Sequence, residues 1–167
     1  MPPRMCQGGL SVPGATIAGM PLCDYFSAPD DQAAVAVLPT GEGPGQAGLD
    51  TVGLKNIDPV VAMARLEAIL TGCGYEEARA LPRAGRLLSD PEDEAAFVVS
   101  LTDTLTAALA TTSADDRARC ARLWSRTGEL RELEISAEDT AGALEALAGL
   151  ARRARGSGRR LYCWWAL

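Results

Sequence analysis

The sequence predicts an α+β or α/β fold in a single domain, with about five helices packed on a small mixed sheet. Its 167 residues suffice for one domain with a sizeable core. Helix-capping residues recur before apolar side chains at helical spacing, and short extended runs lie between them. In the last run, residues 160–167, apolar side chains fall on both faces at a period of two. Such a strand is typically covered on both sides, so we expect it at the centre of the sheet.

The first residues differ from the rest of the chain. We expect residues 1–19 to form a disordered N-terminal extension, and residues 20–167 to form the globular domain. The extension makes a poor signal peptide, because Pro13 and several glycines interrupt its apolar residues. Met20 opens a more protein-like segment, so the extension fits translation from an upstream start codon.

The predicted domain begins with a strand and a helix. Residues 21–26 are mostly apolar or aromatic and predict a short strand. Residues 27–30 predict a helix entry, because Ser27 offers a cap, Pro29 fits the first turn and a carboxylate follows three residues after the cap. Residues 31–38 form this helix in our prediction, although their alternating Ala and Val residues also fit a strand.

The second predicted helix is better defined. It follows a Gly/Pro loop at residues 39–50 and an extended run at residues 51–57. The Asp-Pro pair at residues 58–59 combines a cap with a proline of the first turn. Apolar residues then recur at helical spacing over residues 60–70, and Gly72 provides the C-terminal cap.

Three caps predict the helices of the second half. Thr102, Ser113 and Ser136 each precede a helical pattern. The strongest helix covers residues 137–155, and arginines in its last turn complement the helix dipole. The other predicted elements are a short helix at residues 75–81, a weak strand at residues 85–88, and a strand or helix start at residues 96–101.

Composition excludes several classes of function. The chain has no histidine, which rules out histidine-based acid–base catalysis, Ser-His-Asp and Cys-His nucleophiles, and imidazole metal sites. Its net charge of −6 and pI of about 4.7 oppose binding to a phosphate backbone or an anionic membrane. No apolar run approaches the roughly 18–20 residues that span a bilayer. We therefore expect neither a nucleic-acid partner nor a membrane partner.

The motifs that carry catalytic or cofactor chemistry are also missing. Residues 43–48 match G-x-G-x-x-G by letters, but no helix pattern opens there, so we predict a plain loop. The acids of residues 92–94 lack calcium-loop spacing. Cys73 follows a predicted helix C-terminus, where the potential is negative and does not activate a thiol. The five cysteines are scattered and odd in number, which indicates reduced thiols in the cytoplasm. We expect no catalytic residue set, no metal site and no cofactor.

Four residues are candidates for binding: Trp124, Arg126, Tyr162 and Trp164. Trp, Tyr and Arg are the residue types most often found as anchors at interfaces. The competing interpretation is that the rings pack in the core, and a binding role requires them to share a partly exposed cleft. The arginines between positions 152 and 160 form one basic patch, which dipole complementation and solvation explain.

Four short stretches carry a family likeness. They read Cys-Asp-Tyr-Phe-Ser-Ala-Pro, Asn-Ile-Asp-Pro-Val-Val, Trp-Ser-Arg-Thr and Leu-Tyr-Cys-Trp, at residues 23–29, 56–61, 124–127 and 161–164. Through them, about residues 20–167 resemble an uncharacterised family of small actinobacterial proteins with no assigned activity. The resemblance therefore implies no catalytic residue. The Leu-Thr-Gly helix end at residues 70–72 and the final helix and strand are similar to YfbM-like proteins of the DUF1877 type, which implies an α+β architecture.

Two hypotheses for the function follow. The preferred one is a non-enzymatic cytoplasmic binding or interaction protein, of the immunity or antitoxin kind, with a protein partner or a homodimeric association. It depends on the missing histidine, the acidic charge and the lack of catalytic motifs. The alternative is a small histidine-independent enzyme or small-molecule-binding domain that uses carboxylates, Arg and Tyr. A deep pocket with convergent acids and arginines favours the alternative, whereas an apolar surface patch favours protein binding.

Overall fold

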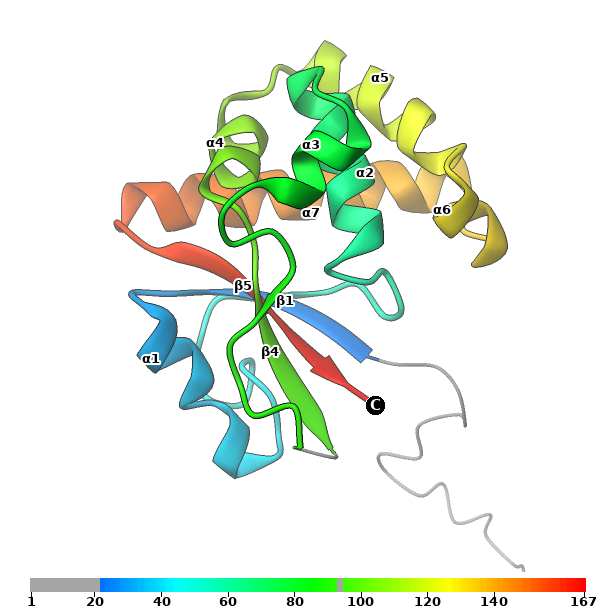
Figure 1. Cartoon of the computed structure of the whole chain (residues 1–167). Coiled ribbons are helices and arrows are strands. Elements are labelled where there is room, and N and C mark those ends of the chain that lie inside the picture. Colours follow the sequence, from blue (N-terminus) through cyan, green and yellow to red (C-terminus); the bar gives the residue numbers. More distant parts are fainter. Residues whose placement is uncertain (1–21, 93–94) are drawn as a thin grey trace, which may run out of the picture.

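The C-terminal strand β5 (Arg160–Ala166) is the central strand of the sheet in the computed structural model, which describes residues 22–92 and 95–167 (Figure 1). It pairs with β1 (Leu22–Ala28) on one side and with β4 (Ala96–Ser100) on the other. The edge strands are β2 (Thr51–Gly53), next to β1, and β3 (Arg86–Leu87), next to β4. Every pairing among these strands is antiparallel, where we expected a mixed sheet.

The predicted α+β class, single domain and central C-terminal strand are confirmed, with more helices than the expected five. Seven α-helices and one 3-10 helix occur in the described residues. Figure 1 shows most helices on one side of the sheet and α1 on the other. The helices are α1 (Asp31–Val35), the 3-10 helix η1 (Leu38–Thr40), α2 (Val61–Thr71), α3 (Tyr75–Ala80), α4 (Asp103–Thr111), α5 (Ala114–Ser125), α6 (Gly128–Glu132) and α7 (Ala137–Gly156).

The sheet separates two apolar clusters, and β5 contributes to both. Leu161 and Cys163 point into the larger cluster, which the helical layer of α2 and α4–α7 covers. Tyr162 and Trp164 point into the smaller cluster, beneath α1 and the segment that follows it. The period of two that predicted a strand covered on both faces therefore holds in the structure.

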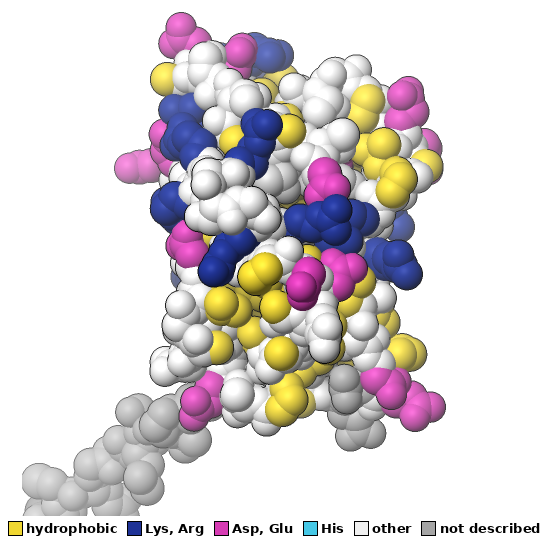
Figure 2. Space-filling model, turned by 90° about the vertical axis from the view of Figure 1, so that its left-hand side faces the viewer, with side chains coloured by type: hydrophobic (Ala, Val, Ile, Leu, Met, Phe, Trp, Pro, Cys, Tyr) yellow, Lys and Arg dark blue, Asp and Glu magenta, His cyan; other side chains and the backbone are white. Residues whose placement is uncertain are grey.

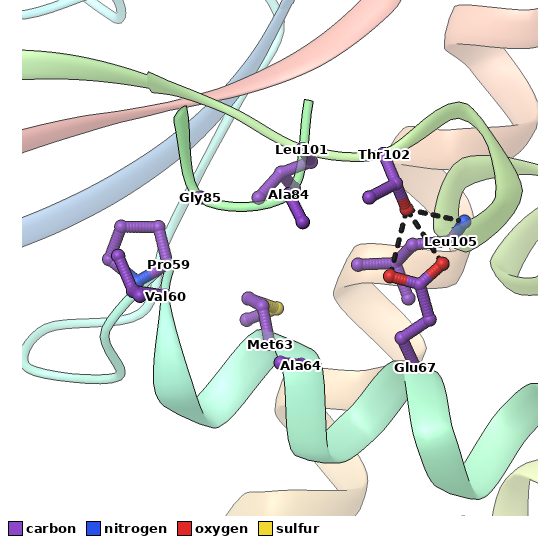
Figure 3. Close-up of a pocket in the computed structure, with 10 residues that line it drawn as sticks. All are labelled: Pro59, Val60, Met63, Ala64, Glu67, Ala84, Gly85, Leu101, Thr102 and Leu105. Carbon is purple, nitrogen blue, oxygen red and sulfur yellow. Dashed lines mark hydrogen bonds between the residues drawn. The ribbon is translucent and has the colours of Figure 1, made fainter. Parts of the chain in front are cut away.

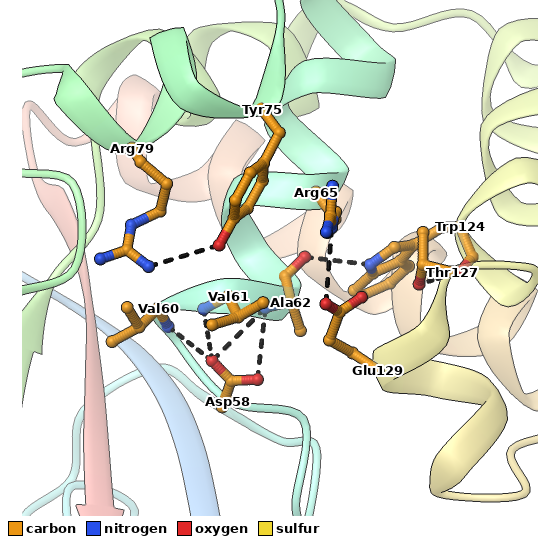
Figure 4. A network of polar contacts seen from close by, with 10 residues as sticks. All are labelled: Asp58, Val60, Val61, Ala62, Arg65, Tyr75, Arg79, Trp124, Thr127 and Glu129. Atoms are coloured by element: carbon orange, nitrogen blue, oxygen red, sulfur yellow. Dashed lines mark hydrogen bonds and ion pairs between the residues drawn. The ribbon is translucent and has the colours of Figure 1, made fainter.

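Side-chain caps begin several helices where the sequence predicts them. Thr102, Ser113 and Ser136 each accept a hydrogen bond from a backbone N–H of the first turn, at the starts of α4, α5 and α7. Asp58 accepts from the N–H groups of Val60, Val61 and Ala62 before α2 (Figure 4). Gly72 ends α2 at a φ of 76°.

The first helix begins at Asp31 as predicted, but the predicted cap, Ser27, was wrong. The cap is Asp30, whose carboxylate accepts from Ala33 N at 2.8 Å. Ser27 lies inside β1 instead, because pairing with β5 continues as far as Ala28 opposite Arg160. The helix is also shorter than predicted, since α1 ends at Val35 and a turn leads into η1.

The remaining predictions concern the N-terminal extension, membrane-spanning helices and the ambiguous segment at residues 96–101. The expected disordered extension at residues 1–19 lies outside the described residues. Within residues 22–92 and 95–167, no helix combines the length and apolar character that crossing a membrane requires. Residues 96–101, which fit a strand or a helix start, are mainly strand β4.

Candidate functional site

The four candidate binding residues do not meet in one cleft. Trp124 is fully buried in the helical layer, and its indole Nε1 donates to the carbonyl oxygen of Ala62 at 3.1 Å (Figure 4). Arg126 is exposed at the end of α5. Tyr162 and Trp164 lie in the other apolar cluster, on the far side of the sheet, with 0% and 8% of their surface exposed. Core packing therefore accounts for the three rings as they stand.

Tyr162 belongs to a polar cluster at the start of α1. Its hydroxyl donates to Asp31 Oδ1 at 2.8 Å, and Arg83 Nη2 lies 2.9 Å from the same oxygen. The Arg83 guanidinium lowers the pKa of Asp31, and burial together with the bond to Asp31 raises the pKa of Tyr162 to about 12. Ser100 Oγ in turn donates to the Arg83 carbonyl at 2.7 Å. Arg83 Nη1 also donates to Asp31 Oδ2 at 3.2 Å, whereas the buried Arg83 Nε has no hydrogen-bond partner among the described residues. The contacts of Asp31 with Arg83 and Tyr162 make this cluster a structural link between α1 and the segment before β3.

A glycine turn covers Trp164. Gly43 has a φ of +83°, and a Cβ added to it would lie 3.2 Å from Cζ3 of the Trp164 ring. Both the left-handed backbone and the close approach to the ring require glycine there. The G-x-G-x-x-G letters therefore lie in a loop in which no helix opens, as predicted, and the structure adds that this loop packs on Trp164.

Glu67 is a buried carboxylate that the sequence analysis missed. It is 2% exposed, its two oxygens lie 2.8 and 2.9 Å from Thr102 Oγ1, and Thr104 Oγ1 also donates to it. Glu67 and Met63 are among the residues that line a small cavity (Figure 3). The volume of this cavity is about 10 Å³. This volume is about that of one water-sized probe, which is too small for an organic substrate. A signal was present in the sequence, because Glu67 lies four residues after Met63 on the apolar face of the helix.

An apolar hollow lies on the helix-facing side of the sheet, between the start of α2 and β3–β5. Its volume is about 240 Å³. Leu87, Phe97 and Trp165 supply most of its large side chains, because register places Leu87 opposite Val99 and Phe97 opposite Trp165. The complete lining consists of Val60, Gly85, Leu87, Pro91, Phe97, Val99 and Trp165.

The helical layer leaves this end of the sheet open. Leu87 is 40% exposed, and Phe97 and Trp165 are half-buried. Gly85, at a φ of +56°, lies so close to Val60 that an added Cβ would be 3.2 Å from its methyl groups. Val60 and Gly85 line both the hollow and the Glu67 cavity, so their contact forms a wall between the two.

The chemistry of the hollow is that of an apolar binding surface. No ionisable side chain is among the residues that line it. Among the described residues, no group of three or more His, Cys, Asp or Glu side chains is placed to hold a metal ion. Burial raises the pKa of the Cys163 and Cys120 thiols, which keeps them protonated and unreactive. The arrangement can bind an apolar group but offers it no acid, base or nucleophile.

The arginines near the end of α7 are partly engaged in ion pairs. Arg153 binds Asp50 through two nitrogen–oxygen contacts of 2.7 and 3.1 Å, and Arg160 lies 3.4 Å from Asp103. Figure 2 shows basic and acidic side chains next to one another on this face of the molecule, with apolar side chains gathered below them. The basic patch is therefore partly neutralised by carboxylates from other elements.

Comparison with known proteins identifies no relative of this chain. No protein-family model, no curated protein and no solved structure matches it. The resemblances seen in the sequence remain predictions, so the function has to be argued from the geometry of the candidate site.

Proposed function

We propose that this chain is a non-enzymatic cytoplasmic binding protein that receives an apolar side chain of a protein partner in the hollow. One observation carries the proposal: Leu87, Phe97 and Trp165 form an open apolar hollow at the end of the sheet that the helices leave uncovered. Contiguous exposed apolar surface of this kind marks interaction sites. An immunity or antitoxin protein works in this way, because it acts by binding and needs no catalytic residue.

The size of the hollow supports a side chain as the occupant. Small-molecule sites usually enclose about 300–1,000 Å³ and bury most of their ligand. The hollow is smaller, at about 240 Å³, and it is open to solvent. Interface anchors are typically single large side chains that fill a pocket of the partner. An apolar side chain that projects from a protein surface meets both conditions.

The alternative function, a small enzyme or metabolite-binding domain, has one observation in its favour. Asp31, Arg83 and Tyr162 converge, and they are the residue types that such a domain uses. The acid of this cluster, Asp31, already contacts both Arg83 and Tyr162, however, and the Glu67 carboxylate lies in a cavity of about 10 Å³. Neither arrangement leaves a free acid or base next to the hollow, which is why we prefer the binding role.

The indole of Trp165 provides the test. In the ¹⁵N-labelled protein, titration with N-acetyl-leucine amide as the probe is expected to shift the Trp165 indole N–H signal. The Trp124 indole signal stays in place, because that ring is fully buried and bonded to Ala62.

Two variants at exposed leucines complete this experiment. Leu87→Ser weakens the shift of the Trp165 signal, whereas Leu123→Ser leaves it unchanged. The two side chains are matched in exposure, at 40% and 41%, and only Leu87 lines the hollow. A Trp165 signal that does not move up to the solubility limit of the probe contradicts the proposed function.

A further inference from the structure

We infer that the partner presents an extended basic segment, which adds to the free edge of β3 as a further strand and places one apolar side chain in the hollow. The inference rests on the proposed function and specifies the class of partner. Two independent features support it: the direction of the backbone groups of Leu87, and the acidic charge beside the hollow.

The hydrogen-bond pattern of β3 directs the backbone N–H and C=O of one residue away from β4. Leu88 N donates to Val98 O at 2.9 Å, and the register places Leu87 opposite Val99. Bonded and non-bonded pairs alternate along an antiparallel ladder. Leu87 therefore forms a non-bonded pair, and its own N–H and C=O point away from β4. Within residues 22–92 and 95–167, β3 is an edge strand, and neither of these two groups has a hydrogen-bond partner beyond that edge.

The free edge and the hollow meet at Leu87. Its side chain lines the hollow, and its backbone supplies the outward N–H and C=O. A residue paired with Leu87 on an added strand would carry its side chain on the same face of the sheet, with the two Cβ atoms about 4.5–5.5 Å apart. That side chain would lie over the hollow. Main-chain bonds and a side-chain pocket are the two components by which sheet edges recognise extended peptides.

Charge beside the hollow indicates the sign of the partner segment. Pro91 lines the hollow, and its neighbours Asp90 and Glu92 are exposed. In the sequence, residues 90–94 contain four acids in five residues, and the whole chain has a net charge of −6. Arg86 does not offset them on this side, because it alternates with Leu87 and faces the opposite side of the sheet. Lys or Arg two residues from the apolar side chain would project toward the exposed Asp90 and Glu92.

A second copy of this chain fits the edge less well. Each copy has a net charge of −6, so the association of two copies brings together molecules of like charge, which opposes it. The exposed edge also offers a single outward residue, Leu87, within a strand of two residues. An added segment therefore has to supply its own positive charge and its own apolar anchor.

Short peptides on the intact ¹⁵N-labelled chain test the inference. The probe is acetyl-Lys-Thr-Leu-Thr-Lys-amide, and the reporters are the Leu87 amide and the Trp165 indole. Both signals are expected to shift, and the Leu87 N–H is expected to exchange more slowly with solvent. A peptide with Glu in place of both Lys binds at least about fivefold more weakly at low salt, and the difference shrinks as salt screens the charges. N-methylation of the peptide's leucine weakens binding about fivefold, because it removes one main-chain donor.

Two variants of Leu87 examine the second main-chain bond of the same pair, in which the Leu87 N–H donates to the peptide. Leu87→Pro removes the outward N–H without removing a ladder bond, and an edge strand tolerates proline at such a position. Leu87→Ala keeps the N–H but retains less apolar surface. We expect Leu87→Pro to bind the Lys peptide more weakly than Leu87→Ala, although proline is the larger side chain. A thermal melt of each variant checks that the fold is kept, and the N-methylated peptide on the unaltered chain gives the result without any variant.

Each contrary outcome has a distinct meaning. If N-acetyl-leucine amide shifts Trp165 but N-methylation changes nothing, the hollow binds side chains without strand pairing; the inference is then overturned while the proposed function stands. Equal binding of the Glu and Lys peptides overturns the basic partner. A concentration-dependent dimer that Leu87→Pro abolishes makes a second copy the occupant and also overturns the inference. If no probe moves Trp165, the inference and the proposed function both fall.

Discussion

The Tyr162→Phe substitution tests how the far face of the sheet is held together. It removes only the hydroxyl, which donates to Asp31 Oδ1 at 2.8 Å, and it leaves the buried ring in place. Hydrogen bonds to charged groups contribute roughly 1.5–3 kcal/mol. The Asp31 side chain is 42% exposed and keeps its contact with Arg83, so water replaces part of the lost bond. We therefore expect a loss of about 1.5 kcal/mol, or roughly 3–6 °C in Tm for a chain of this size.

The same substitution has a signature at high pH. Burial and the bond to Asp31 raise the pKa of Tyr162 to about 12, whereas an unfolded tyrosine titrates at about 10. The folded state thus favours the neutral phenol, and this contribution is complete below about pH 10. It is lost as the pH rises toward about 12, because the unfolded chain then ionises first. The unfolding free energies of the original chain and of Tyr162→Phe converge over this window.

Urea unfolding at neutral pH and at several values between about pH 10 and 12 measures both effects. Tyr75→Phe is the matched control, since the Tyr75 hydroxyl is bonded only to Arg79 at 3.4 Å near the surface. We expect this control to change stability by less than about 0.5 kcal/mol. A cost of Tyr162→Phe no larger than that of Tyr75→Phe, or a difference that stays constant with pH, refutes the role given to the hydroxyl.

Three further pairs of substitutions test side-chain packing and the cap of α4. Trp164→Ala is expected to lower the free energy of unfolding in urea by about 3–5 kcal/mol. Trp165→Ala is expected to lower it less, because that ring is half-buried, so equal losses would contradict the assignment of the two rings to opposite faces. Gly43→Ala is expected to cost more than Gly41→Ala, since both residues have a positive φ but only Gly43 lies against a ring; equal changes in Tm would argue against that contact. Thr102→Val removes the cap of α4 and a hydroxyl donor to Glu67, and it is expected to lower the free energy of unfolding by about 2–4 kcal/mol. Thr102→Ser keeps both interactions and is expected to lower it by less than about 1 kcal/mol. If Thr102→Ser lowers Tm as much as Thr102→Val, the hydroxyl does not account for the loss of stability.

Local signals made much of the fold predictable. Ser113 and Ser136 cap helices because a side-chain oxygen reaches an N–H only three residues away, so the sequence carries the whole interaction. The central position of residues 160–166 followed from apolar side chains on both faces. Ser27 failed as a cap because long-range pairing between β1 and β5 held it in a strand. Helix α6 was missed because five residues that start with glycine carry no helical periodicity.

The candidate site was harder to predict, because it depends on which surface the fold leaves uncovered. Alternation along β5 placed Tyr162 and Trp164 on one face and Trp165 on the other, but it could not say which face stays open. The face of Trp164 is closed by α1 and by the turn at Gly43. The hollow joins residues as distant as Val60 and Trp165, and the pairings of β3, β4 and β5 bring its strand residues together. Glu67 alone carried a local signal, as a carboxylate on an apolar helix face.

The two edges of the sheet differ in a way that bears on where a partner binds. Beside β2, the bidentate pair between Arg153 of α7 and Asp50 places a charged link next to the edge. Before β3, the pair between Arg83 and Asp31 provides a charged link to α1, on the other side of the sheet from the hollow. The outward backbone groups of Leu87 lie next to the apolar hollow instead. Proteins commonly limit unwanted pairing by keeping edge strands short and charged. With two residues and the exposed Arg86, β3 offers too little edge for indiscriminate pairing, so recognition has to come from the anchor in the hollow and from charge.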